Sequence, residues 1–176
     1  MTDLDVVGIG NALVDVLTHC EDDFLERHEL AKGAMILVDE ERSGSLYDQL
    51  GPSLECSGGS CGNTMAGFAA LGGSMGEVSA AYVGKVRNDQ LGEVFRHDMR
   101  AMGVSFDTAP QLDGPATGRC LVMISPDAQR TMCTYLGAAT KLTPADIDPG
   151  VIQAAKITYM EGYLFDPPDA QHAFVR

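Results

Sequence analysis

Short apolar runs alternate with amphipathic segments along most of the chain. Four of the runs end at glycine or directly before a charged residue, and the first of them is β-branched, which predicts buried strands at residues 5–10, 34–38, 79–84 and 156–160. The segments between them repeat apolar residues at helical spacing or stop at glycine, which predicts helices over residues 21–30, 40–50, 64–71 and 89–102. This alternation predicts an α/β fold with a mostly parallel sheet covered on both faces.

One stretch breaks the alternation. Residues 117–124 and 130–136 read as two strands around the turn 125–129, which predicts a β-hairpin that stands apart from the parallel sheet. Residues 143–146 have the pattern of a helix start, with Thr, Pro and Asp in the favoured positions. A further helix start is predicted near Pro168.

Charge and composition narrow the classes of partner. Twelve Lys and Arg against 25 Asp and Glu give a net charge of −13, which opposes binding to nucleic acid or to an anionic membrane surface. The N-terminus lacks the features of a signal peptide, and no apolar run approaches the ~18 residues of a membrane helix. The five cysteines and four histidines show no zinc-site spacing. We expect a cytoplasmic protein with reduced cysteines, no bound metal and a small-molecule partner.

Residues 58–63, Gly-Gly-Ser-Cys-Gly-Asn, are the most informative segment for chemistry. Gly58 and Gly59 allow the backbone to approach a ligand closely, and the predicted helix after them offers free N–H groups. Asn63 can both donate and accept hydrogen bonds, which suits sugar hydroxyls. The same pattern also fits a tight turn in which Asn63 is only a helix N-cap.

Asp15 is the lone carboxylate of the apolar run 12–17. A buried carboxylate is costly unless it is paired or hydrogen-bonded, and two neighbouring hydroxyls of a ligand would meet that need. Alternatively, Asp15 faces water on an alternating strand. A dinucleotide-binding oxidoreductase is a competing interpretation, because Gly8-Ile9-Gly10 follows a strand and Asp39 ends the next one. The third glycine of that fingerprint is Leu13, so the evidence for it is weak.

Together these segments resemble the PfkB family of carbohydrate and nucleoside kinases, which includes ribokinases and adenosine kinases. The similarity runs in the family's order over essentially all 176 residues, and its motifs lie at residues 10–15, 57–73, 83–92, 130–139 and 159–163. The segment 57–73 is similar to the N-terminal signature of the family. The segment 159–163 is similar to a strand end of the adenosine kinase-like branch.

The resemblance implies a ribokinase-like sandwich with a small β-lid built from residues 12–38 and 116–136. It implies transfer of the γ-phosphoryl group of ATP, with Mg²⁺, to a primary hydroxyl of a nucleoside or sugar, most closely as in adenosine kinases. A ribokinase- or fructokinase-type sugar kinase is the alternative, and a non-catalytic sugar- or nucleoside-binding module is the second alternative. The lid is also a candidate surface for a homodimer.

The resemblance also implies roles for individual residues. Asp15 would bind two sugar hydroxyls, and Gly58 and Gly59 would let the sugar lie against the backbone. Asn11 and Asn63 would add hydrogen bonds. The base or lid side of the pocket would be lined by Leu13, Met35, Met132, Thr134 and Leu164, and Arg130 would lie near the transferred phosphate.

One departure from the family is large. The second signature, a G-A-G-D anion hole with the catalytic Asp base, does not occur here, and no P-loop replaces the ATP-binding loops that follow it. Members of the family are nearly twice this length. We therefore expect residues 1–176 to be the N-terminal, substrate-binding portion of such a kinase, inactive alone, with the catalytic base C-terminal to Arg176.

Overall fold

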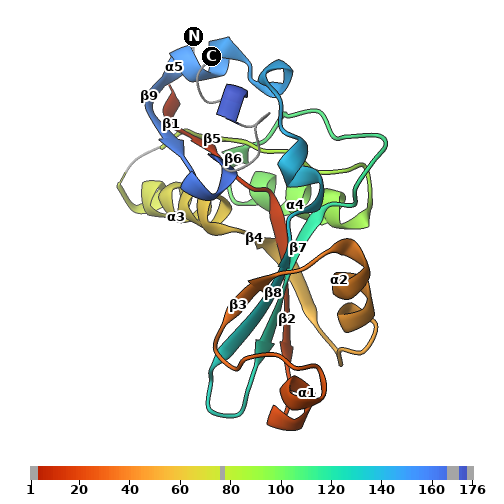
Figure 1. Cartoon of the computed structure of the whole chain (residues 1–176). Coiled ribbons are helices and arrows are strands. Elements are labelled where there is room, and N and C mark those ends of the chain that lie inside the picture. Colours follow the sequence, from red (N-terminus) through yellow and green to blue (C-terminus); the bar gives the residue numbers. More distant parts are fainter. Residues whose placement is uncertain (1–3, 76–77, 166–170, 174–176) are drawn as a thin grey trace.

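The computed structural model of the chain describes residues 4–75, 78–165 and 171–173, and its strands form two sheets (Figure 1). The first sheet has four parallel strands in the order β6-β5-β1-β9. The second sheet has five strands in the order β3-β8-β7-β2-β4 and mixes parallel with antiparallel pairs. The predicted α/β class with a mostly parallel sheet is confirmed. The helix start predicted near Pro168 lies outside the described residues.

The first sheet is buried on both faces along its inner strands, whereas its edge strand Ala155–Met160 is largely exposed. Its strands are β1 (Leu4–Ile9), β5 (Ala80–Val83), β6 (Val104–Ser105) and β9 (Ala155–Met160). Neighbouring residues of β1 point to opposite sides, so Val6 packs in the cluster with Met65 and Phe95 while Val7 packs in the cluster with Leu142. The covering helices are α3 (Ser60–Met75), α4 (Gln90–Ala101) and α5 (Pro149–Ala154), with 3₁₀ helices at Gly137–Lys141, Pro144–Asp146 and Gly162–Phe165.

The second sheet is covered by helices on one face only. Its strands are β2 (Leu13–His19), β3 (Met35–Leu37), β4 (Leu54–Gly58), β7 (Gly118–Ile124) and β8 (Arg130–Tyr135). Helices α1 (Asp22–Arg27) and α2 (Glu40–Tyr47) bury Phe24 and Leu46 against Val16 and Leu121 of the sheet. Figure 1 shows this sheet and its two helices extending away from the parallel layer.

The hairpin β7–β8 stands apart from the parallel sheet, as predicted, with its turn at residues 125–129. The segments 12–38 and 116–136 supply four of the five strands of the second sheet, and β4 comes from outside both of them. In the described ranges, none of the helices is long and apolar enough to span a bilayer.

Three local predictions are wrong. Helix α3 begins at Ser60 rather than at residue 64, and it continues through Gly72, the predicted stop. Gly72 lies within the helix, where its missing Cβ leaves room for Val78 to pack directly against the helix backbone. The helix start predicted at residues 143–146 is only a 3₁₀ turn with a capping box, and α5 begins at Pro149.

The dinucleotide interpretation is also wrong. That fingerprint needs a helix directly after the glycines, but the chain after Gly10 enters β2 of the second sheet. Asp39 is the N-cap of a helix and not a free ribose-binding acid, because its carboxylate accepts a hydrogen bond from the backbone N–H of Arg42 at 2.8 Å.

Candidate functional site

Several predicted site residues lie on one face of the second sheet, opposite the face that packs on α1 and α2. Residues in register on neighbouring strands point to the same side of a sheet, and every second residue of a strand shares that side. One row across all five strands therefore contains Leu37, Thr134, Cys120, Asp15 and Cys56. The next row contains Met35, Met132, Val122, Leu17 and Leu54.

We call this surface the open face, because none of the apolar clusters among the described residues includes a side chain from it. The same alternation places Leu13, Gly58 and Arg130 on the open face. Seven predicted site residues thus share one surface, although the sequence separates them by more than 100 positions: Leu13, Asp15, Met35, Gly58, Arg130, Met132 and Thr134.

Asp15 is half-buried on this face. Burial raises the pKa of its carboxyl above the ordinary value of 3.8, and the attraction of the Arg130 guanidinium opposes that rise in pKa. Among the described residues, no group donates a hydrogen bond to the Asp15 carboxylate. A desolvated carboxylate with free acceptor oxygens favours a ligand that brings hydroxyl donors.

Gly58 and Gly59 let the chain after β4 close tightly over Asn11 and Asp15. A Cβ added at Gly58 would overlap the Asp15 carboxylate. Gly59 has φ of +78°, a conformation that favours glycine, and a Cβ there would lie 2.8 Å from the carbonyl oxygen of Asn11. Both glycines are therefore needed by the protein's own packing at the place where a ligand would meet Asp15.

Glu161 was not among the predicted site residues, yet it joins three of the site's segments. Its side chain is 4% exposed. The carboxylate accepts hydrogen bonds from the Asn11 backbone N–H at 2.7 Å, the Asn11 Nδ2 at 2.9 Å and the Cys61 N–H at 3.1 Å. It also accepts one from the Ser60 hydroxyl. This carboxylate caps α3 from a distance, which explains why the helix starts earlier than its sequence predicts.

The remaining predicted residues are placed in different surroundings. Asn11 is buried and one N–H of its Nδ2 donates to Glu161, so its side chain keeps the Oδ1 acceptor and a second N–H donor for another partner. Asn63 lies within the first turns of α3 with its side chain exposed, and it is not the N-cap. Leu164 does not line the open face. It is fully buried with Val7 and Leu142 beneath the first sheet.

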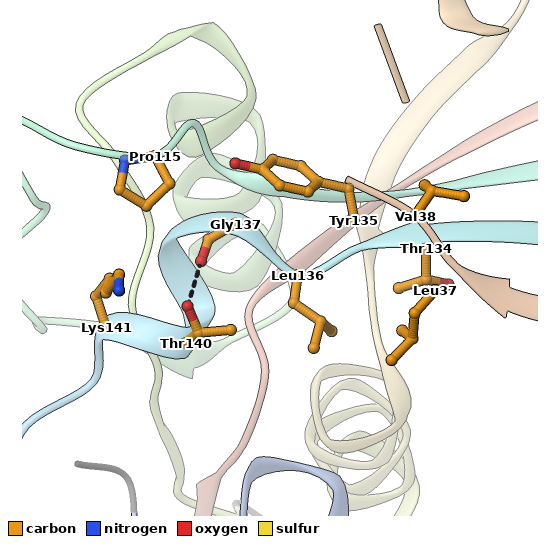
Figure 2. A pocket seen from close by; sticks show the side chains of 9 residues that line it. All are labelled: Leu37, Val38, Pro115, Thr134, Tyr135, Leu136, Gly137, Thr140 and Lys141. Atoms are coloured by element: carbon orange, nitrogen blue, oxygen red, sulfur yellow. Dashed lines mark hydrogen bonds between the residues drawn. The ribbon is translucent and has the colours of Figure 1, made fainter. Parts of the chain in front are cut away.

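A cavity of about 390 Å³ lies at the β3–β8 edge of the open face (Figure 2). Its walls include Leu37, Thr134 and Leu136, and the 3₁₀ helix Gly137–Lys141 closes one side. The Thr140 hydroxyl in that wall donates to the Gly137 carbonyl at 2.8 Å. The volume falls in the range of small-ligand sites. Sequence reasoning missed Leu37 and Leu136, although the period of two from Met35 and Thr134 would have found both.

The described residues contain no group of three or more His, Cys, Asp or Glu side chains that could hold a metal ion. The thiols beside Asp15 are held protonated. Burial raises the pKa of Cys120 to about 11, and burial also raises the pKa of Cys56.

The architecture matches solved structures of small-molecule kinases. An adenosine kinase from Sinorhizobium meliloti superposes with a TM-score of 0.87 at 49% identity, over 97% of this chain and 51% of that one. A "probable sugar kinase protein" from Rhizobium etli CFN 42 superposes with a TM-score of 0.89 at 48% identity, over 99% of this chain and 52% of that one. The ribokinase-like fold implied by the motifs is therefore confirmed.

Sequence comparison gives the family. Residues 36–175 match the pfkB family of carbohydrate kinases, and the chain belongs to that family. The guanosine-inosine kinase of Escherichia coli K12 is 26% identical over 165 residues, which cover 90% of this chain but 37% of that protein. The chain thus spans about half or less of the length of these relatives.

Proposed function

We propose that this chain provides the nucleoside-binding part of an ATP-dependent nucleoside kinase of the adenosine kinase type. The observation that carries the proposal is the row on the open face that runs from Asp15 to the cavity beside Thr134. The two residues lie two strands apart, about 10 Å at the usual strand spacing. A nucleoside has the same layout, with hydroxyls at one end and a largely apolar ring at the other.

In this proposal Asp15 accepts hydrogen bonds from two ribose hydroxyls and so orients the primary hydroxyl for phosphorylation. The base lies over Leu37, Thr134 and Leu136, and the second sheet acts as a lid that excludes water from the reacting groups. Arg130 supplies positive charge near the transferred phosphate. Membership of a kinase family supports the use of ATP, whereas Mg²⁺, the cytoplasmic location and a homodimer through the lid stay predictions.

A sugar kinase is the second candidate, and the resemblance to the Rhizobium etli protein favours it. Calorimetry on the intact protein expressed from its own gene separates the two, with adenosine, guanosine, inosine, ribose and fructose as ligands. A nucleoside should bind more tightly than ribose, because only the nucleoside fills the cavity as well as the Asp15 end. Tighter binding of ribose or fructose would favour the sugar kinase, and no binding of any ligand would contradict both.

Residues 1–176 alone should show no phosphoryl transfer in an ATP-coupled assay. The physical reason is that neither the G-A-G-D motif nor a P-loop occurs in this sequence. An isolated piece that binds nucleoside without turnover would agree with a binding portion. Turnover with any nucleoside or sugar would disprove the expectation.

As the pH is lowered, nucleoside affinity should begin to fall at a pH above the ordinary pKa of an aspartate. The ionised carboxylate accepts both hydroxyls, and burial raises the pKa of Asp15 above 3.8. Three groups face it: the Arg130 guanidinium, which attracts the carboxylate, and the thiols of Cys56 and Cys120, whose raised pKa values keep them from titrating in acid. Calorimetric titration over a pH series measures this. Constant affinity down to the ordinary pKa of aspartate would exclude Asp15 as the acceptor.

A further inference from the structure

Glu161 is a buried carboxylate that receives hydrogen bonds from two segments distant in sequence. One oxygen, Oε2, accepts from the backbone N–H and the Nδ2 of Asn11, and the other, Oε1, accepts from Ser60 and from the N–H of Cys61. The backbone N–H of Glu161 itself donates to the Ile9 carbonyl at 2.9 Å. The residue thereby joins the end of β9 to the end of β1 and to the first turn of α3.

The chemistry of this cluster requires an acceptor with two oxygens. A carboxylate has no donor and about four lone-pair sites, so it can satisfy all four groups at once. Its charge is also favoured at the positive end of α3. A helix cap alone does not need such a group, since a neutral Ser or Asn serves at lower desolvation cost. Glu161 therefore does more than begin a helix.

The position of Asn11 is transmitted to the ligand-facing carboxylate by contact. The Asn11 carbonyl oxygen lies 2.8 Å from the point where a Cβ of Gly59 would stand, and Gly58 lies directly against the Asp15 carboxylate. A shift of Asn11 therefore displaces the glycine pair and, through it, Asp15. We propose that Glu161 is a positioning residue, which holds Asn11 and the Gly58-Gly59 backbone at the spacing that two ribose hydroxyls require. This inference rests on the proposed nucleoside function.

The experiment measures adenosine against 2′-deoxyadenosine and 3′-deoxyadenosine by calorimetry on the intact protein. The variants are Glu161→Ala, which removes both oxygens, and Glu161→Gln, whose remaining oxygen can serve Asn11 while its amide faces the N–H of Cys61. The matched control is Glu41→Gln, at an exposed position of α2. The ratio of the dissociation constants is the readout, because partial unfolding scales the binding of all three ligands equally and leaves their ratio unchanged.

The wild-type protein and Glu41→Gln should prefer adenosine over the deoxynucleosides by about tenfold or more, because a site built for a hydroxyl rejects the ligand that lacks it. Glu161→Ala should reduce this ratio toward one, and Glu161→Gln should reduce it by a smaller factor. If Glu161→Ala does not fold, the ratio of dissociation constants in Glu161→Gln tests the positioning role instead. Wild-type ratios in the folded variants would overturn the positioning role while leaving the proposed function standing. No binding of any nucleoside to the wild type would overturn the proposed function itself.

Discussion

Replacing Asp15 with asparagine should abolish tight nucleoside binding and at the same time stabilise the protein. Two hydroxyl bonds to a charged acceptor contribute about 3 kcal/mol or more together, which corresponds to roughly a 100-fold loss of affinity. No hydrogen bond within the described part of the chain is lost, and the electrostatic attraction to Arg130 that is lost is weaker than the effect of burial on this carboxylate. Calorimetry with adenosine measures the loss, and Asp23→Asn, an exposed position on α1, serves as the control.

The effect of Asp15→Asn on stability has a definite sign and a definite dependence on pH. Burial raises the folded-state pKa of Asp15 above the unfolded value, so the charged carboxylate destabilises the folded state at pH values above that raised pKa. The destabilisation decreases as the pH falls through the raised pKa and disappears below 3.8, where the group is neutral in both states. Asp15→Asn should therefore raise the unfolding temperature near neutral pH and raise it less in acid.

These two measurements distinguish a ligand-binding Asp15 from a structural one. A carboxylate retained for stability would leave the protein less stable when it is replaced, at neutral pH above all. A gain in stability together with a loss of binding is the pattern of a residue whose cost to the fold is offset only when ligand is present. Unchanged affinity in Asp15→Asn would refute the binding role.

The residues of the open face were predicted from the resemblance to the PfkB family, which assigned Met132 and Thr134 to the lid side of the pocket and Asp15 to the sugar. The period of two along each strand explains why these residues share a face, and the strand register brings Asp15 into line with Thr134. Strand β4 was missed because Leu54–Gly58 is short, mixed in polarity and ends in glycine, so it resembled a loop.

Long-range contacts and short turns account for the features of the site that were not predicted from the sequence. Glu161 bonds to residues 100 and 150 positions away, and no local pattern records such a partner. Leu164 was placed in the pocket, but the 3₁₀ helix Gly162–Phe165 turns it inward and leaves Tyr163 and Phe165 exposed. A strand end and a tight helical turn direct the same three residues differently, and the sequence does not distinguish them.

Adding a single methyl group at Gly58 should destabilise the protein and displace the Asp15 carboxylate. A second substitution that removes this carboxylate should reduce the loss of stability. The new Cβ would overlap the Asp15 carboxylate, so Gly58→Ala should cost about 1–3 kcal/mol of stability through overpacking and should displace the acceptor. Gly59→Ala should cost about 1–2 kcal/mol from its left-handed backbone alone. Gly67→Ala is the control. Its Cβ would meet nothing within 4 Å, and alanine should stabilise that helix by about 0.5–1 kcal/mol.

The second substitution is Asp15→Ala, which removes the group that the methyl would strike. In that background the stability cost of Gly58→Ala should shrink, whereas the cost of Gly59→Ala should persist because its close neighbour is the backbone of Asn11. Urea unfolding of the single and double variants gives the coupling energy directly. Equal costs of Gly58→Ala in both backgrounds would show that this glycine is required for something other than the approach of the backbone to Asp15. A coupling confined to Gly58 would show that the two glycines are required for different reasons. Gly58 would be needed for the close approach to the Asp15 carboxylate, and Gly59 for the left-handed backbone of the turn.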